Sequence, residues 1–149
     1  MNRMMTKSEI AAEKMTEGYN CAQAIFYAYC EDLQFEKDLA LKIAAGFGAG
    51  MGRKGEVCGA VSGGIIVIGF KYGSAEKNNR SAKERTYTKT RELIDQFQKR
   101  HGAFICRDLL KGCDLMTKQG RRHFKEDDLF NRTCKPCVES VAEILDKIM

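Results

Sequence analysis

The sequence contains no tryptophan and one proline among its 149 residues, and it has no long apolar run. Because prolines punctuate loop-rich and all-β folds, their scarcity favours helices. The longest stretch without a charged residue, 57–70, has fourteen residues, whereas a helix needs about twenty apolar residues to cross a bilayer. We therefore expect no membrane-spanning segment and no membrane partner.

The first thirteen residues carry Lys7, Glu9 and Glu13 and lack the apolar stretch of a secretory signal peptide. This favours a cytoplasmic location, where thiols stay reduced. The chain is long enough to bury a core without disulfides. Metal ligation or redox chemistry therefore explains its seven cysteines better than structural disulfides do.

The net charge of +5 is modest, and the basic stretch 71–100 has acidic residues interleaved with the basic ones. This pattern is typical of a solvated helix face, and it lacks the concentrated basic stripe of a nucleic-acid interface. We expect no nucleic-acid partner.

The sequence predicts an all-α fold, a single domain over 1–149 with about six to eight helices. Capping signals at Thr6, Asn20 and Ser81 are each followed three residues later by Glu or Gln, and each predicts a helix start. The polar segment 118–132 is expected to be mainly loop. The expected helices run from near residue 7 to 18, from 20 to about 33, and over 35–47, 57–72, 81–100, 106–110 and 135–148.

Two of these helices have distinct apolar positions. The helix over 35–47 places apolar side chains at spacings of four, and the helix over 81–100 is expected to turn five side chains inward. In sequence order, these residues are Phe35, Leu39, Ile43 and Phe47, then Tyr87, Thr90, Leu93, Ile94 and Phe97.

Eight glycines lie between residues 46 and 64. The first five predict an irregular Gly-rich turn, because glycine adopts positive φ without steric cost. A buried central helix follows the turn, with small residues at 59, 60, 63 and 64 that let a neighbouring helix approach closely. Its β-branched run 65–68 is also compatible with a strand, but no second strand candidate exists to pair with it.

Cys58 is expected in the first turn of that central helix. Unpaired backbone N–H groups and the positive end of the helix dipole favour a thiolate there, and Arg53 and Lys54 add positive charge nearby. The alternative is a small buried hydrophobic residue, because free cysteine is among the most buried residue types. If this corner binds a cofactor, the candidate contacts are Gly55, Cys58 and Gly59.

The other cysteines exclude some kinds of site. Cys134 and Cys137 form a Cys-x-x-Cys pair, but the next residue is Val138, so c-type haem attachment is excluded. A zinc ribbon needs a second such pair, which the sequence lacks. Cys30 is expected to be structural. His101 and His123 have no ligand-spaced partner and are expected to be surface or capping residues.

Four segments in fixed order resemble a known family. They are GYNCAQA at 18–24, AGFGAGMG at 45–52 running into GEVCGAVSG at 55–63, CRDLL with GCD at 106–114, and the cysteine at 134. This arrangement is similar to the redox-active proteins named for the pattern C_GCAxxG_C_C, whose four cysteine places correspond to Cys21, Cys58, Cys106 and Cys134. Gly59 departs from the named pattern.

The resemblance implies redox activity, and similar domains beside c-type haems in split-Soret-type cytochromes imply electron transfer with a partner protein. In one interpretation, Cys58, Cys106, Cys113 and Cys134 ligate an iron–sulfur cluster or other metal centre, with Cys21 and Cys137 as substitutes. In a second, Cys58, Cys106 and Cys134 are redox thiols of a disulfide relay centred on Cys58. In a third, the cysteines are inert and the chain is a helical interaction module.

We also expect a homodimer. The long helix over 81–100 and the aromatic stretch 26–29 offer more apolar surface than a compact monomer needs. Light scattering that gives the monomer mass of 16.8 kDa would contradict this expectation.

Overall fold

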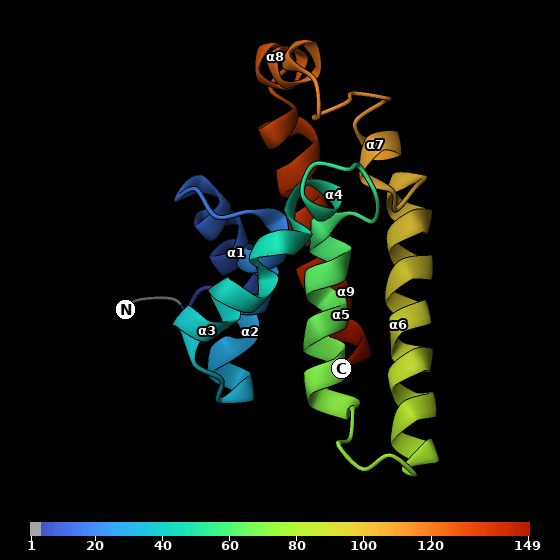
Figure 1. Ribbon diagram of the computed structural model, residues 1–149. Coiled ribbons are helices and arrows are strands. Elements are labelled where there is room, and N and C mark those ends of the chain that lie inside the picture. Colours follow the sequence, from blue (N-terminus) through green and yellow to red (C-terminus); the bar gives the residue numbers. More distant parts are fainter. Residues whose placement is uncertain (1–3) are drawn as a thin grey trace.

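The computed structural model describes residues 4–149 and confirms the all-α prediction (Figure 1). Seven helices in this range have eight residues or more, and none of its residues belongs to a strand. Residues 1–3 of the predicted domain lie outside the described residues. The α-helices are α1 (Lys7–Thr16), α2 (Cys21–Leu33), α3 (Lys37–Ala44), α4 (Gly48–Met51), α5 (Gly59–Tyr72), α6 (Arg80–His101), α7 (Cys106–Leu109), α8 (Lys118–Glu126) and α9 (Lys135–Ile148), with a 3₁₀ turn η1 (Ala45–Phe47) and a π-helical segment η2 (Phe130–Cys134).

Side-chain caps begin two helices as predicted. Thr6 accepts a backbone N–H of α1, and Asn20 forms a reciprocal capping box at the start of α2. The third predicted start was wrong in detail, since α6 begins at Arg80 and is capped by Asn79 instead of Ser81. Asparagine accepts the orphan N–H groups of a helix start as well as serine does.

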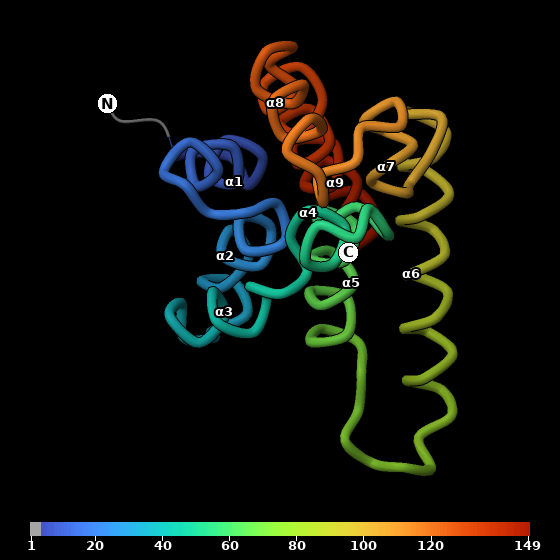
Figure 2. The backbone as a smooth tube through the Cα atoms, turned by 45° about the horizontal axis from the view of Figure 1, so that its top comes forward, coloured from blue at the N-terminus to red at the C-terminus, as the bar shows by residue number. Residues whose placement is uncertain are grey.

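The central helix is α5, which lies between the α2–α3 pair and α6 in both views (Figures 1 and 2). It includes 65–68, so the choice of helix over strand is confirmed. A Cβ on Gly63 would lie 2.8 Å from the carbonyl oxygen of Ala22, and one on Gly64 would lie 2.7 Å from Leu93. The predicted close approach of neighbouring helices is therefore confirmed. None of the helices within 4–149 combines the length and hydropathy needed to cross a membrane.

The last helix, α9, has the predicted bounds and packs against α1, α2, α5 and α6. Its Val138, Val141 and Leu145 are fully buried, as its helical periodicity predicts. The hydroxyl of Tyr29 in α2 donates a 2.8 Å hydrogen bond to the carboxylate of Asp146 in α9. α9 therefore joins the first and last parts of the chain into one core.

The inward face predicted for the helix over 81–100 was wrong in part, and the apolar side chains spaced by four in the helix over 35–47 are not buried. The helix over 35–47 is shorter in the structure, and Leu39 and Ile43 are each 46% exposed because α3 meets the core through its alanines. In α6, Tyr87 is 49% exposed, and only the C-terminal half of the helix supplies buried side chains. The apolar spacing in these helices predicts a helix correctly but does not identify the face that is buried.

The stretch 26–29 does not offer the surface that the dimer prediction assigned to it. Phe26 and Tyr29 are at most 2% exposed and belong to the core. The exposed large apolar side chains lie instead on helices α3, α5 and α6, among other places. The homodimer stays a prediction that now depends on those helices.

The segment 118–132, expected to be mainly loop, is largely helical. Thr117 caps α8 by accepting the N–H of Gly120, and the π-helical segment leads directly into α9. α8 turns only Gly120 and Phe124 away from solvent, so its polar composition conceals the helix. The apolar side chains of this region form a satellite cluster of Cys106, Leu110, Cys113 and Leu129 with Leu115, Phe124 and Cys134 packed against it.

Replacing Gly63 with alanine should lower the free energy of unfolding by about 1–3 kcal/mol, because the new Cβ meets the backbone of Ala22. Gly69→Ala on the same helix is the matched control. Nothing lies within 4 Å of a Cβ at Gly69, so this change should raise the free energy of unfolding by roughly 0.5–1 kcal/mol. Urea unfolding followed by circular dichroism measures both changes, and equal effects would contradict the close contact of α5 with α2.

Candidate functional site

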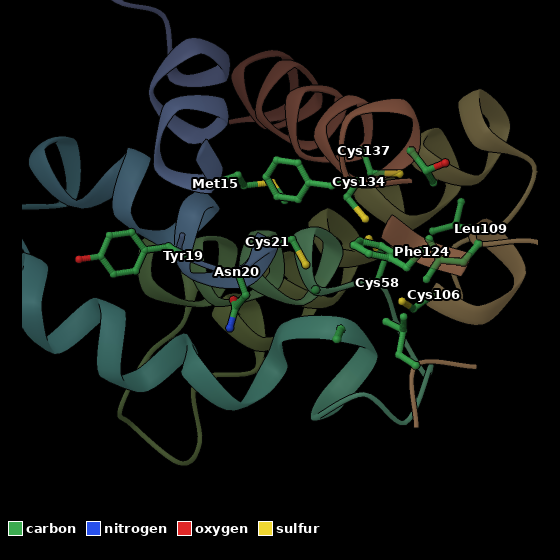
Figure 3. Close-up of a pocket in the computed structure, with 16 residues that line it drawn as sticks. Met15, Tyr19, Asn20, Cys21, Cys58, Cys106, Leu109, Phe124, Cys134 and Cys137 are labelled. Carbon is green, nitrogen blue, oxygen red and sulfur yellow. The ribbon is translucent and has the colours of Figure 1, made fainter. Parts of the chain in front are cut away.

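Five cysteine side chains surround one cavity of about 160 Å³ at the end of the bundle where α2, α5 and α7 begin (Figure 3). The thiols come from four separate parts of the chain and belong to Cys21, Cys58, Cys106, Cys134 and Cys137. The cavity is otherwise mostly apolar, and its other lining residues include Met15, Leu109, Leu110, Leu115, Phe124 and Phe130. The thiols are therefore surrounded mainly by apolar side chains.

A short antiparallel backbone pairing holds two of these thiols together. The N–H of Cys58 donates to the carbonyl of Phe104 at 2.9 Å, and the N–H of Cys106 donates to the carbonyl of Glu56 at 2.6 Å. Val57 and Ile105, which lie between these two hydrogen bonds, form an isolated antiparallel β-bridge. No sequence pattern predicts this pairing, because one bridge is too short to produce the alternating pattern of a strand.

Helix N-termini direct backbone N–H groups at two of the sulfur atoms. Cys58 is the N-cap of α5, one position before the predicted first turn, and the N–H groups of Ala60 and Val61 lower its pKa. Cys21 is the first residue of α2, and the N–H groups of Cys21 and Ala22, together with that of Ala49 in the neighbouring turn, act in the same direction on its pKa. Donors of this kind favour the thiolate form.

Cys58 has a pKa below its usual value. The largest cause is the thiol of Cys137, which donates a hydrogen bond to the Cys58 sulfur, and this effect exceeds the opposing effect of burial. The same contact raises the pKa of Cys137 far above its usual range. Within this pair, the Cys58 thiol therefore ionises more readily than the Cys137 thiol.

The remaining cavity thiols favour the neutral form. Burial raises the pKa of Cys21 to about 11 and that of Cys106 to about 12, and it places the pKa of Cys134 higher still. Negative charge on neighbouring sulfurs contributes to all three of these raised pKa values, after burial. Several thiolates can therefore coexist here only with positive charge between them.

A left-handed turn forms one wall of the cavity. Ala49, Gly50, Met51 and Gly52 have φ values from 55° to 68°, and a Cβ on Gly50 would lie 2.7 Å from the Cβ of Cys106. Glycine adopts this conformation freely, as predicted, whereas alanine and methionine each cost about 1–2 kcal/mol. Backbone strain of this kind concentrates at functional sites. The sequence carries no signal for it at Ala49 or Met51.

Two of the predicted site residues lie away from the cavity. Gly59 lines it, but Gly55 lies against the side chain of Arg107. Cys113 lies in the satellite cluster, where its thiol donates to the carbonyl of Gly120 at 3.1 Å. The structure therefore brings Cys21 and Cys137, which were substitutes in the predicted ligand set, closer to the shared space than Cys113.

The remaining cysteine and the two histidines also lie elsewhere. The Cys30 thiol donates to a carbonyl of its own helix, His101 lies 2.9 Å from the hydroxyl of Ser140, and His123 lies 3.4 Å from the carboxylate of Asp127. None of the three lines the cavity. Within 4–149, no group of three or more His, Cys, Asp or Glu side chains is arranged to hold a metal ion directly.

The chain is thus an all-α protein with five thiols around one cavity at one end of its helical bundle. The chain belongs to the family described as "Putative redox-active protein (C_GCAxxG_C_C)", which matches residues 19–148. It is 29% identical over 121 residues to an uncharacterized protein of Archaeoglobus fulgidus. The aligned residues cover 76% of this chain and 80% of that relative. No solved structure matches the chain. The predicted family is thus confirmed.

Replacing Gly59 with alanine should displace the Cys21 thiol, because the new Cβ collides with its sulfur. We expect the free energy of unfolding to fall by about 1–3 kcal/mol and Cys21 to react faster with iodoacetamide. Gly46→Ala is the control, since nothing lies within 4 Å of a Cβ there. Peptide mass spectrometry after timed alkylation measures the rate, and an unchanged Cys21 would contradict the contact.

Removing the Cys137 donor should raise the pH at which Cys58 ionises. In reduced, metal-free protein, thiolate absorbance near 240 nm reports this titration, and its lowest-pH step should move upward in Cys137→Ala. Cys137→Ser keeps an O–H donor and should restore most of the shift. An identical titration in the alanine variant and the native protein would contradict the donor role of Cys137.

Proposed function

We propose that the protein is a small cytoplasmic one-electron carrier and that its cavity binds an iron–sulfur cluster or a comparable thiolate-ligated metal centre. The observation that carries this proposal is the convergence of five thiols from four parts of the chain on one apolar cavity of about 160 Å³. A single tetrahedral ion lies about 2.3 Å from each sulfur and needs no such space. A cluster occupies the volume between its ligands.

The residues present fit such a group. Iron–sulfur clusters take four thiolates in most types, and Cys21, Cys58, Cys106 and Cys134 are the ligands we assign. Bound iron would supply the positive charge that allows these buried sulfurs to ionise together. Cys137 is left as a thiol that donates to Cys58.

The surrounding residues would hold such a centre in place and influence its potential. Hydrogen bonds to the sulfurs and solvent exposure both influence the potential of a cluster. The N–H groups of Ala49, Ala60 and Val61 supply the hydrogen bonds, while Phe124 and Phe130 exclude water. A bound cluster supplies reversible one-electron storage.

A second candidate is a dithiol–disulfide couple of Cys58 and Cys137. Its support is the low pKa of Cys58 beside a donating thiol. Oxidation would join the two sulfurs and release two protons and two electrons to an acceptor disulfide, which becomes two thiols. The two sulfurs belong to residues that are 6% and 2% exposed, so a protein disulfide has poor access to them. This burial favours the metal centre.

Anaerobic purification with iron and acid-labile sulfide assays tests the proposal. The native protein should contain both elements and absorb visible light, and the absorbance should bleach on reduction. Cys58→Ser and Cys106→Ser should each lose most of the iron, whereas Cys30→Ser, a change at a buried cysteine outside the cavity, should keep it. Circular dichroism of each variant separates loss of ligand from loss of fold.

A result without iron or sulfide would also distinguish the two candidate functions. Protein purified without air that contains neither iron nor sulfide would contradict the metal centre. If that protein also becomes lighter by two hydrogen atoms on mild oxidation, with Cys58 linked to Cys137 in its peptide map, the dithiol couple is the better account.

A further inference from the structure

Three of the five cavity cysteines, Cys58, Cys106 and Cys137, are buried, whereas Cys21 and Cys134 are partly exposed. Cys58 and Cys137 are almost completely buried, and Phe124 of α8 and Phe130 of η2 line the cavity. The outer surface of this cover therefore brings an electron-transfer partner close to the buried thiols. The inference below rests on the proposed one-electron function, and it concerns the surface at which the partner binds.

The cover on one side is a single helix. α8 turns Phe124 toward the cavity. Apart from Phe124 and the buried Gly120, every residue of this helix is exposed. In Figures 1 and 2 this helix lies at the end of the bundle opposite the α5–α6 connection. Because a helix with its side chains is about 10 Å across, a protein on its outer face comes within roughly that distance of the cavity.

The exposed face of α8 is basic and carries unpaired charge. Within 4–149, none of its four basic side chains has a carboxylate within ion-pair distance, and these residues are Lys118, Arg121, Arg122 and Lys125. The acidic residues of this region follow at 126–128, and Asp127 pairs with His123. In α6, by contrast, Lys89 pairs with Glu92 on its own helix.

The segments around the cavity also have a positive net charge. Residues 48–58 and 103–135 contain ten basic and six acidic residues, so they carry a net +4 of the chain's +5. The remaining two thirds of the chain is close to neutral. Charge concentrated at one end of a molecule orients an approaching protein of opposite charge and speeds its association.

We propose that the outer face of α8 is the docking surface for an acidic one-electron carrier protein. The basic side chains orient the partner, and its redox group then faces the cover formed by Phe124. Docking at this face exchanges electrons with the cavity without exposing a thiol to solvent.

The test uses an acidic plant-type ferredoxin, fluorescently labelled, as the probe, and fluorescence anisotropy measures its dissociation constant with the native protein. At an ionic strength of about 0.01 M we expect binding, and at about 0.3 M we expect it to weaken at least tenfold. Arg121→Glu/Arg122→Glu should weaken low-salt binding about tenfold or more. The matched control is Arg85→Glu/Arg91→Glu, at two exposed arginines of α6, which gives the same net charge of +1.

The control should change the dissociation constant less than about twofold, and stopped-flow electron transfer should follow the same order. Equal weakening by both pairs would overturn the proposal, since only net charge would then matter. Absence of low-salt binding, or tighter binding of a single-stranded oligonucleotide, would also overturn it. Iron and sulfide assays on the same samples report the metal centre separately, so its failure is distinguishable from failure of the docking surface.

Discussion

The close packing of α5 against α2 is the constraint on which the rest of the site depends. Gly59 and Gly63 lack side chains where the two helices meet, so the N-terminus of α5 lies beside that of α2. Helix N-termini carry unpaired N–H groups and partial positive charge. Cys21 and Cys58 stand at these two positions, so the packing that builds the core also brings two thiols to one cavity.

Several residues of the site lower the stability of the helical bundle around it. Burial disfavours ionisation of most cavity thiols, and the left-handed residues Ala49 and Met51 hold a conformation that side chains disfavour. The apolar contacts of α5 and α9 with the rest of the core offset these costs. Sites that break local rules while the remaining fold obeys them are typical of functional positions.

The chemistry and the surface charge of this molecule are separated by one layer of apolar side chains. Sulfur lies inside, phenylalanine and leucine cover it, and the basic face of α8 lies outside. Under the proposed function, the apolar layer would limit the access of water and oxidants to the thiols, and the charged layer would orient a partner. Membership of a redox-active family agrees with this arrangement.

Local interactions made much of the fold predictable from sequence. The caps at Thr6 and Asn20, the central helix and the last helix each depend on residues within about four positions of one another, which helical periodicity reveals. The sequence also indicated cysteine chemistry and singled out Cys58. The polar helix α8 escaped prediction because only one of its large side chains turns inward.

Tertiary structure alone decided which further cysteine joins, in the cavity, the four that match the family pattern. Cys106 reaches Cys58 through backbone pairing between segments almost fifty positions apart, and Cys137 lines the cavity while Cys113, just past a helix end, lies outside it. Spacing along the chain cannot distinguish these outcomes. The position of each sulfur depends on how whole helices pack, and that packing is settled by the sum of many weak contacts across the core.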